Sequence, residues 1–337
     1  MIANFKTYVS NLKKLTIIIP SFNRPTFLMR TLRYWSGKGV QIICIDGSFD
    51  KLNDQFISSL NPNIVYNHLP NSSFKDRMLI ANEKISTEFI LFHADDEFHI
   101  PSGLSECINV IENEDLVACI GRCLEFSIEN KKINGRPWRT FHTSFEGYSI
   151  MDNSPIVRIL SNLNPYLCSI PTSVIKTSIY KNAISFYKRY DLESNVMTEL
   201  IFSICVSFQG KSKVVNNLSW IRSLENPPHR LKVGKPNSSI GNFTEFLLDS
   251  KFRSDPLIGH LSNYLCTINP KYNQDDLEDV IFSAFRAYAR QASLSFKIAN
   301  LYNNNDIPLS AEKRILQETI GTWSDRDFYP PPPKTLD

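Results

Sequence analysis

The stretch Glu88–Glu97, EFILFHADDE, decides the fold that we predict for this chain. It opens with an apolar run, Phe89 to Phe92, and turns acidic at Asp95 and Asp96. A short apolar run that ends in a turn is typical of a buried strand. Carboxylates just beyond the C-terminal end of such a strand lie where open α/β sheets bind their ligands. The stretch therefore predicts a central strand with a ligand site at its end.

The two neighbouring carboxylates are candidate metal ligands. Asp95 and Asp96 repel each other unless a cation or solvent lies between them. Carboxylate oxygens are hard ligands that suit Mg²⁺ or Mn²⁺. The pair thus indicates a metal–nucleotide site, and the alternative is a solvated turn that carries acids without a metal.

Length and composition describe an ordinary globular protein. The 337 residues allow one large domain or two smaller ones, and the net charge of +3, from bases and acids mixed along the chain, predicts no nucleic-acid partner. The seven cysteines are scattered, which favours a reducing compartment. The N-terminus does not resemble a secretory signal, and we see no run of about 20 apolar residues. We expect a cytoplasmic protein, at most peripheral to a membrane.

Strand and helix patterns alternate through the first part of the chain. Apolar runs predict strands at residues 15–19, 40–45, 63–67, 89–92, 116–126 and 169–175. Helical patterns cover residues 26–35, with Thr26 as the cap, and residues 74–85, 103–112 and 192–208. This order predicts an α/β fold with a mostly parallel sheet flanked by helices. Residues 127–165 predict a long irregular loop, and neither a GxGxxG nor a P-loop motif occurs.

The character of the chain changes after residue 225. Residues 225–236 are rich in proline, lysine and histidine and predict a linker, and the pattern from residue 242 onward is helical. We therefore divide the chain into residues 1–225, which hold the sheet, and residues 226–337, a linker with a helical C-terminal region. The basic residues of that region leave contact with a membrane open, and a solvated helical bundle is the alternative.

Four segments, taken in order, resemble the family 2 glycosyltransferases, which have the GT-A fold. Residues 16–24 read TIIIPSFNR, like the first strand and P-x-[FY]-N-R segment of that family, and residues 46–48 read DGS, like the turn after its second strand. Arg77 stands 18 residues before Asp95, a spacing that fits the family's helix Arg and its D-x-D-D motif. Glu199 falls where the family has an acidic pair. The resemblance covers residues 15 to about 225 and implies a nucleotide-sugar-binding and catalytic GT-A domain there.

The resemblance implies roles for particular residues. A donor nucleotide of the UDP or dTDP type would be bound by Pro20, Phe22, Asn23, Arg24, Asp46, Arg77, Ala94 and Asp95. Asp95, with Asp96, would hold Mn²⁺ or Mg²⁺ at the diphosphate, and His229 in the linker is a further candidate there. Glu199 would be the base that takes the proton of the acceptor hydroxyl, so that transfer inverts the anomeric carbon.

Departures from the family pattern keep alternatives open. His93 stands where the first metal-motif Asp is expected, and its alternative role is that of a hydrogen-bonded core histidine. Asp46 is a single acid where the family has a doublet, and a DGS segment equally suits a turn-capping Asp. Arg77 has the alternative of a surface helix residue.

The position of the base also departs from the family pattern. The pair reads Thr198–Glu199 where the family has Glu–Asp. A solvated helix acid is the alternative for Glu199, and Glu193 and Asp191 are competing acids nearby. Glutamate is one methylene longer than aspartate and carries the same acid group, so the resemblance still assigns the base to Glu199.

The function implied is a metal-dependent, inverting transfer of a sugar, a hexose or a related one, from a nucleotide diphosphate to a glycan or lipid-linked acceptor. The setting would be bacterial surface-polysaccharide synthesis, in the cytoplasm or at the inner face of the cell membrane. The rival hypothesis is a non-catalytic module of the same fold that binds nucleotide or glycan. A nucleotidyltransferase would need a Gly-rich loop after the first strand, and PSFNRP is not such a loop.

Overall fold

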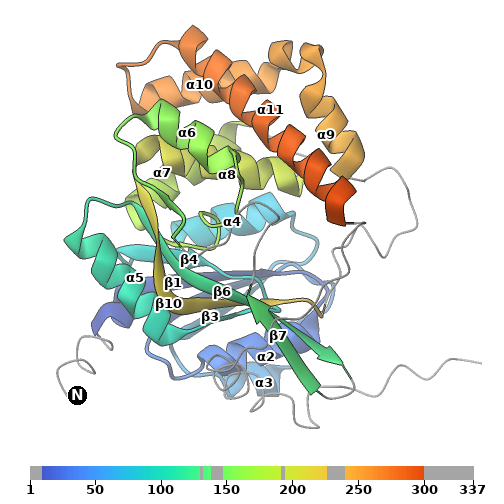
Figure 1. Ribbon diagram of the computed structural model, residues 1–337. Helices are drawn as coiled ribbons and strands as arrows, with labels where there is room; N and C mark the ends of the chain where they lie inside the picture. Colours follow the sequence, from blue (N-terminus) through green and yellow to red (C-terminus); the bar gives the residue numbers. More distant parts are fainter. Residues whose placement is uncertain (1–9, 130–131, 138–146, 191–193, 226–239, 300–337) are drawn as a thin grey trace, which may run out of the picture.

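The computed structural model describes residues 10–129, 132–137, 147–190, 194–225 and 240–299. These residues form one ten-stranded sheet with helices on both faces (Figure 1). The strand order is β3-β2-β1-β4-β9-β6-β10-β5, with β7 beside β6 and β8 beside β10. The predicted α/β class with a mostly parallel sheet is confirmed.

The first half of the sheet is parallel throughout. Its elements are β1 (Leu15–Ser21), α2 (Pro25–Trp35), β2 (Gln41–Asp46), α3 (Asp54–Ser58), β3 (Ile64–His68), α4 (Phe74–Glu83) and β4 (Phe89–Phe92). β1 pairs with β2 and β4, and β2 pairs with β3, all in parallel register. Parallel strands end at one edge of the sheet, so the loops after β1, β2 and β4 meet there.

The second half of the sheet is mixed. Its elements are β5 (Phe98–His99), α5 (Pro101–Asn113), β6 (Ala118–Glu129), β7 (Lys132–Pro137), β8 (Ser149–Ile150), α6 (Pro155–Leu163), β9 (Val174–Lys176), α7 (Thr177–Arg189), α8 (Asn195–Gln209) and β10 (Ser212–Ser223). β10 is parallel to β6, whereas β9 is antiparallel to β4 and β6. Helix α5 lies so close to β10 that a Cβ on Gly103 would stand 2.2 Å from the carbonyl oxygen of Leu218. A residue with a side chain at this position would therefore push the helix away from the sheet.

The central strands divide their side chains between two cores. On β1, Ile17 and Ile19 belong to the core under α2 and α5, and Ile18 belongs to the core under α4, α7 and α8. This is the period-two alternation of a strand that is buried on both faces, and it explains the continuous apolar run in the sequence. All three side chains are fully buried, so truncation of one to alanine should cost ~2–5 kcal/mol of stability.

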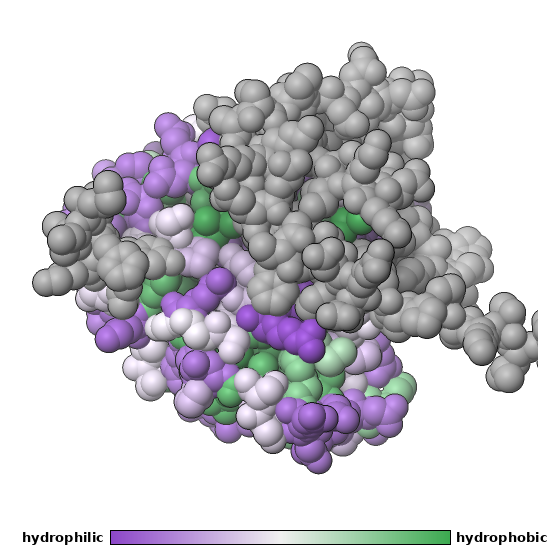
Figure 2. Space-filling view, turned by 90° about the horizontal axis from the view of Figure 1, so that it is seen from below, coloured by the Kyte–Doolittle hydropathy of each residue, from purple (hydrophilic) through white to green (hydrophobic). Residues whose placement is uncertain are grey.

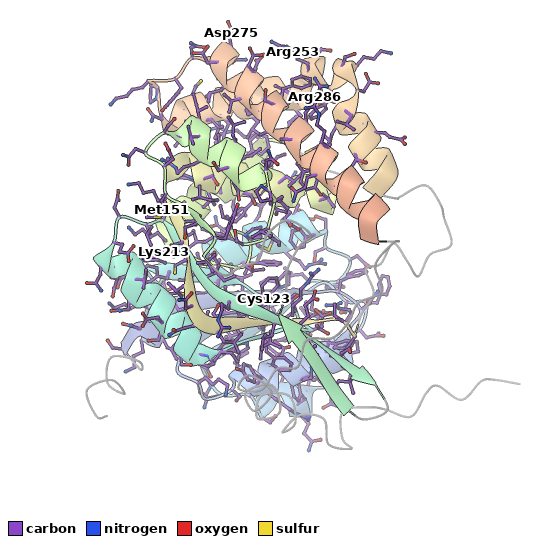
Figure 3. All side chains as sticks on the ribbon, in the orientation of Figure 1. Cys123, Met151, Lys213, Arg253, Asp275 and Arg286 are labelled. Carbon is purple, nitrogen blue, oxygen red and sulfur yellow. The ribbon has the colours of Figure 1, made fainter. Side chains whose placement is uncertain are left out.

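The C-terminal helices form an outer layer over α6 and α8 (Figure 1). They are α9 (Ile240–Leu248), η3 (Ser250–Ser254), α10 (Pro256–Ile268) and α11 (Gln274–Ala299). Leu247, Leu261 and Phe285 of this layer lie in the same hydrophobic core as α7 and α8. Charged side chains such as Arg253 and Asp275 stand on the layer (Figure 3). The helical region thus shares its core with the sheet, and the division of the chain at residue 225 stays a prediction.

Two properties bear on membrane contact. No helix within the described ranges is long and apolar enough to cross a membrane. Figure 2 shows the face opposite the C-terminal helices, where the described surface mixes hydrophilic and hydrophobic residues. On that face, no single kind of residue marks a docking area among the described residues.

Three predictions of local structure are wrong. Part of the expected loop at residues 127–165 forms the hairpin β6–β7 and helix α6, which starts with a proline at its first turn, where proline is tolerated. The strand expected at residues 169–175 is only the short β9, and α7 follows it at once. Thr26 is not the cap of α2, because the helix begins at Pro25 and has no side-chain cap.

Candidate active site

The loops after β1 and β2 are fastened to each other. Asn23 has a left-handed φ of 55°, which asparagine tolerates. Its backbone N–H donates to Ser48 Oγ at 2.8 Å, and its Oδ1 accepts from the Phe49 N–H at 3.1 Å. The rings of Phe22 and Phe49 pack edge to face, 5.7 Å apart. The PSFNR segment is thereby held against the DGSF turn at the carboxyl edge of the sheet.

Asp46 is buried at the start of that turn, with 1% of its surface exposed. Its Oδ1 accepts from the Ser48 N–H at 3.0 Å and from the Ser48 hydroxyl, and its Oδ2 accepts from the Tyr66 hydroxyl at 2.8 Å. The turn-capping role is therefore present. Of the two carboxylate oxygens, Oδ2 accepts one of these bonds and has a second lone pair. Contact of Asp46 with a nucleobase stays a prediction.

Arg77 lies across the same turn and is 7% exposed. Its Nη1 donates to the Ser72 carbonyl at 2.8 Å, and its guanidinium stands 5.5 Å from the centroid of the Phe22 ring. A Cβ on Gly47 would be 2.2 Å from Arg77 Nη1, so glycine leaves the space that the guanidinium occupies. Burial lowers the pKa of Arg77. The alternative of a surface helix arginine is therefore wrong.

The acidic motif is held by an arginine from the loop after β1. Asp95 and Asp96 are 2% and 8% exposed. Arg24 contacts Asp95 Oδ1 through Nη2, and the same nitrogen lies 3.0 Å from Asp96 Oδ1. Ser21 donates from Oγ to Asp95 Oδ2 at 2.6 Å. One guanidinium thus offsets the repulsion between the two carboxylates.

The backbone of the motif is also fixed, by helix α2. Thr31 Oγ1 donates to the Asp95 carbonyl at 2.7 Å, and Arg30 Nη2 donates to the Asp96 carbonyl at 2.9 Å. Arg30 also forms a buried ion pair with Glu225, 2.8 Å apart. Loss of one partner of such a pair leaves a buried charge and costs ~3–5 kcal/mol. Helix α2 therefore holds the strand end that carries the acids.

His93 belongs to the core. It is fully buried, and its Nδ1 lies 2.9 Å from the Nδ1 of His99, so that one of the two rings donates to the other. Burial lowers the pKa of both rings, that of His99 to about 3. The alternative of a core histidine is therefore the one that the structure favours, and the departure from the family motif does not touch the surface of the site.

A cavity of about 470 Å³ opens at this edge of the sheet. Its lining consists of Pro20, Ser21, Phe22, Arg24, Ser72, Ser73, Phe74, Arg77, Phe92, Ala94 and Asp95. Six of the eight residues expected at a nucleotide are among them, and Asn23 and Asp46 are the two that are not. The volume is within the range of small-molecule sites. The predicted nucleotide residues are thus largely brought together.

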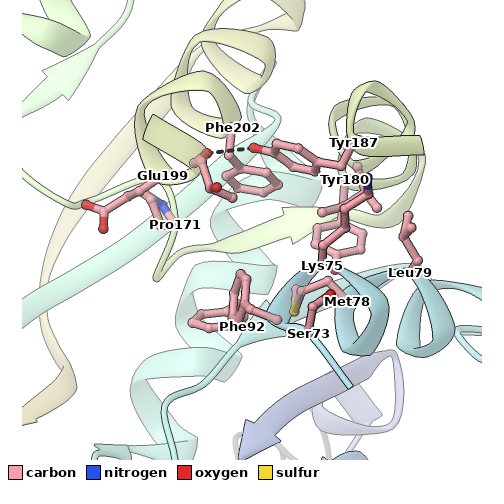
Figure 4. Close-up of a pocket in the computed structure, with 13 residues that line it drawn as sticks. Ser73, Lys75, Met78, Leu79, Phe92, Pro171, Tyr180, Tyr187, Glu199 and Phe202 are labelled. Carbon is pink, nitrogen blue, oxygen red and sulfur yellow. Dashed lines mark hydrogen bonds between the residues drawn. The ribbon is translucent and has the colours of Figure 1, made fainter. Parts of the chain in front are cut away.

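A second cavity of about 440 Å³ contains the expected base, Glu199 (Figure 4). It shares Ser73, Phe74 and Phe92 with the first cavity, so the two adjoin along that wall. Glu199 stands on α8, about one turn from its start, and its Oε1 accepts from the Tyr166 hydroxyl at 2.6 Å. The structure thus places Glu199 next to the first cavity, and its role as the base stays a prediction; the sequence contained no signal for Tyr166.

Tyr166 is itself held by the C-terminal region. The Gln291 side chain on α11 accepts from the Tyr166 backbone N–H through Oε1 at 2.8 Å. The rings of Tyr166 and Tyr288 pack edge to face with centroids 5.5 Å apart. Helix α11 therefore supports the residue that orients the carboxylate of Glu199.

Glu97 ends the same acidic stretch, and the sequence predicts no role for it. It follows Asp96 directly, is half-buried, and accepts from the Trp220 indole N–H at 2.8 Å. Burial, and then the charge of Asp96, raise the pKa of Glu97 to about 8. Three other candidates, His229, Glu193 and Asp191, lie outside the described residues.

The acidic motif fits a cation that is shared with a ligand. Within the described part of the chain, no three His, Cys, Asp or Glu residues converge to hold a metal by themselves. Mg²⁺ is commonly bound by one or two carboxylates together with substrate phosphates. Asp95 and Asp96 supply two hard oxygen donors, and Asp95 lines the cavity, so this donor set is the kind that a diphosphate would complete.

Comparison with known proteins gives one family match and several similar solved structures. Residues 16–169 match the model of the family described as Glycosyl transferase family 2. No curated protein matches the chain. The chain is similar to the crystal structure of S. aureus TarS 1–349, with 13% identity and a TM-score of 0.44 over 87% of this chain and 94% of that one. Its similarity to the same protein in complex with UDP-GlcNAc has 15% identity and a TM-score of 0.46, over 85% of this chain and 92% of that one.

The family match spans the structural parts of the first cavity. It includes β1, β2 and β4, the loops that carry Arg24 and Asp95, and helix α4, which carries Arg77. That match, over the segments that line the cavity, identifies the chain as a glycosyltransferase.

Proposed function

We propose that the chain moves a sugar from a nucleotide diphosphate, of the UDP or dTDP type, to a hydroxyl of a glycan or lipid-linked acceptor. The observation that supports this most strongly is the pair of adjoining cavities. One is lined by Arg24, Arg77 and Asp95, and the other contains the carboxylate of Glu199. A donor in the first cavity and an acceptor in the second would meet at their common wall.

The cationic side chains suit a diphosphate. Arg24 presents guanidinium N–H groups at the edge of the first cavity and is about a third exposed, so it can turn toward phosphate oxygens. Arg77 lies deeper, with its guanidinium over the ring of Phe22. Both side chains would lie near one end of the donor. The nucleobase of the donor would lie at the DGS turn, where Asp46 could accept from the N3–H of uracil or thymine.

A bound Mn²⁺ or Mg²⁺, held by Asp95 with help from Asp96, would neutralise the negative charge that develops on the leaving diphosphate. Arg24 contacts both carboxylates. Cation binding therefore requires this guanidinium to move away, which would bring it toward the phosphates. His229 is a further candidate for this part of the site.

Glu199 would act on the acceptor. Its Oε1 accepts from Tyr166, and Oε2 would take the proton of the acceptor hydroxyl. Attack from the side of Glu199, opposite the leaving diphosphate, would invert the configuration of the anomeric carbon. Such an enzyme would serve synthesis of a bacterial surface polysaccharide, at the inner face of the cell membrane or in the cytoplasm.

A donor screen tests the proposal. Purified protein is scanned for thermal unfolding with UDP, dTDP, GDP and their sugars, each with Mn²⁺ and with EDTA, because specific binding raises the apparent stability. Donors that stabilise the protein are then assayed for release of the nucleotide. We expect stabilisation by a uridine or thymidine diphosphate in the presence of Mn²⁺. If none of the nucleotides stabilises the protein or is released from its sugar, the proposal is wrong.

A further inference from the structure

The cavity beside Glu199 is unusually apolar for a site that receives a sugar acceptor. Nine of its thirteen lining residues are aromatic or aliphatic. Figure 4 shows Glu199 and Leu79 on opposite sides of the view, with Phe92 and Phe202 between them. The cavity therefore has a carboxylate at one side and an aliphatic side chain at the other.

The polar groups in its wall are mostly engaged within the protein. The Ser73 hydroxyl donates to Asp76 Oδ2 at 2.6 Å, and the Thr198 hydroxyl donates to the Ser194 carbonyl at 3.0 Å. The Tyr187 hydroxyl donates to the Thr198 carbonyl at 2.6 Å, the bond drawn in Figure 4. A sugar ring buried among these residues would leave several hydroxyls without a partner, which is costly.

The hydroxyl of Tyr180 differs from these engaged polar groups. It is 1% exposed, lines the cavity, and its hydroxyl has no hydrogen-bond partner among the described residues. Burial raises the pKa of this hydroxyl, so it stays protonated and can donate. A ligand oxygen within reach of this hydroxyl would give the donor a partner. The wall thus suits a ligand with an apolar body and few oxygens.

We propose that this cavity binds the apolar portion of the acceptor, a long-chain alkyl or prenyl group, whose polar head lies at Glu199. The assignment rests on the proposed function and narrows the acceptor to a lipid-type molecule. The shared wall formed by Ser73, Phe74 and Phe92 places that head next to the donor cavity. Glu199 then reaches the hydroxyl of the head, while the chain lies among the side chains of α4, α7 and α8.

Two glycosides that differ only in their aglycone test the proposal. Methyl β-D-glucoside and n-octyl β-D-glucoside are titrated into the full chain by calorimetry, the latter below the concentration at which micelles form. We expect the octyl compound to bind at least ~10-fold more tightly, since each buried methylene adds to the affinity. Equal affinities, or no binding of either compound, would overturn the proposal.

A variant that fills the cavity provides a second test of the proposal. Leu79→Trp places a larger side chain in the cavity, and Leu160→Trp, also at a partly buried leucine of a helix but outside the lining, is the matched control. The octyl preference should disappear in L79W and persist in L160W. If L79W keeps the octyl preference, or if it weakens binding of a nucleotide sugar but not of the nucleotide, the cavity does not hold the acceptor chain.

The same samples separate this proposal from the proposed function. UDP and dTDP affinities with Mn²⁺ are measured alongside the glycosides. If the wild type binds neither nucleotide, the transferase proposal is refuted. The affinities of the two glycosides would still show whether the apolar cavity binds an alkyl chain.

Discussion

Replacing Tyr166 with phenylalanine tests whether Glu199 must be held in place to act as a base. The Tyr166 hydroxyl donates to Glu199 Oε1 at 2.6 Å. The variant keeps the ring, its packing on Tyr288, and the backbone bond to Gln291. It therefore removes the hydrogen bond to Glu199 and a longer one, 3.5 Å, between the Tyr166 and Ser203 hydroxyls.

The magnitude follows from the kind of bond that is lost. A hydrogen bond to a charged group contributes ~1.5–3 kcal/mol, and about 1.4 kcal/mol corresponds to a factor of ten. If about half of this energy serves to orient the carboxylate, kcat should fall roughly 3- to 12-fold. Donor affinity should not change, because Tyr166 does not line the donor cavity.

The assay measures kcat for transfer and the dissociation constant of the donor in four proteins: wild type, Y166F, E199Q and the double variant. If Tyr166 acts through Glu199, Y166F should add little to the loss already caused by E199Q, since contacting residues are not additive. Tyr264→Phe is the control, because it removes a tyrosine hydrogen bond to the Asn182 carbonyl away from both cavities. Full additivity of Y166F and E199Q, or an equal loss in Y264F, would refute the reasoning.

Three further predictions concern the acids and the buried histidines. Asp95→Ala should abolish Mn²⁺-dependent nucleotide binding while the protein stays folded, and unchanged nucleotide affinity in calorimetry would show that Asp95 is not the ligand. Asp46→Asn should weaken UDP or dTDP binding more than Mn²⁺ binding, whereas equal affinities would leave Asp46 as a turn residue only. Burial holds the pKa of His99 at about 3, below its ordinary 6.5, so the unfolded chain binds more protons between these values and stability should fall as the pH drops from 6.5 toward 3. His99→Phe should remove part of this decline, on the order of 3 kcal/mol in urea unfolding, and an unchanged pH profile would contradict the assignment.

The parts of the fold that could be predicted are those that periodicity describes. The strands at the centre of the sheet are continuous apolar runs because both faces are buried, as Ile17 and Ile18 show. The hairpin β6–β7 was not predicted, because β7, KINGRP, contains glycine and proline and pairs with β6 alone. Helix α7 was not predicted, because it follows the short strand β9 without a turn signal between them.

The candidate site divides in the same way. Arg24, Arg77 and Asp95 lie next to strand ends or on the following helix, so the order of elements places them at one edge. The contacts that support the site join residues that are far apart in the chain. Tyr166 and Gln291 are 125 residues apart, and Arg30 and Glu225 are 195 residues apart. No local pattern encodes such pairs, because they depend on how the helices pack.

The claim that Glu199 is the base of a sugar transfer is tested most directly by Glu199→Gln, which keeps the shape and polarity of the side chain and removes its basicity. The measurement is kcat for transfer from the donor found in the screen, together with the donor dissociation constant. We expect a loss of at least ~100-fold in kcat, the lower end for a general base, at unchanged donor affinity. Transfer by E199Q at a rate near that of the wild type would contradict the account, and the acids at positions 191 and 193 would then be the residues to replace.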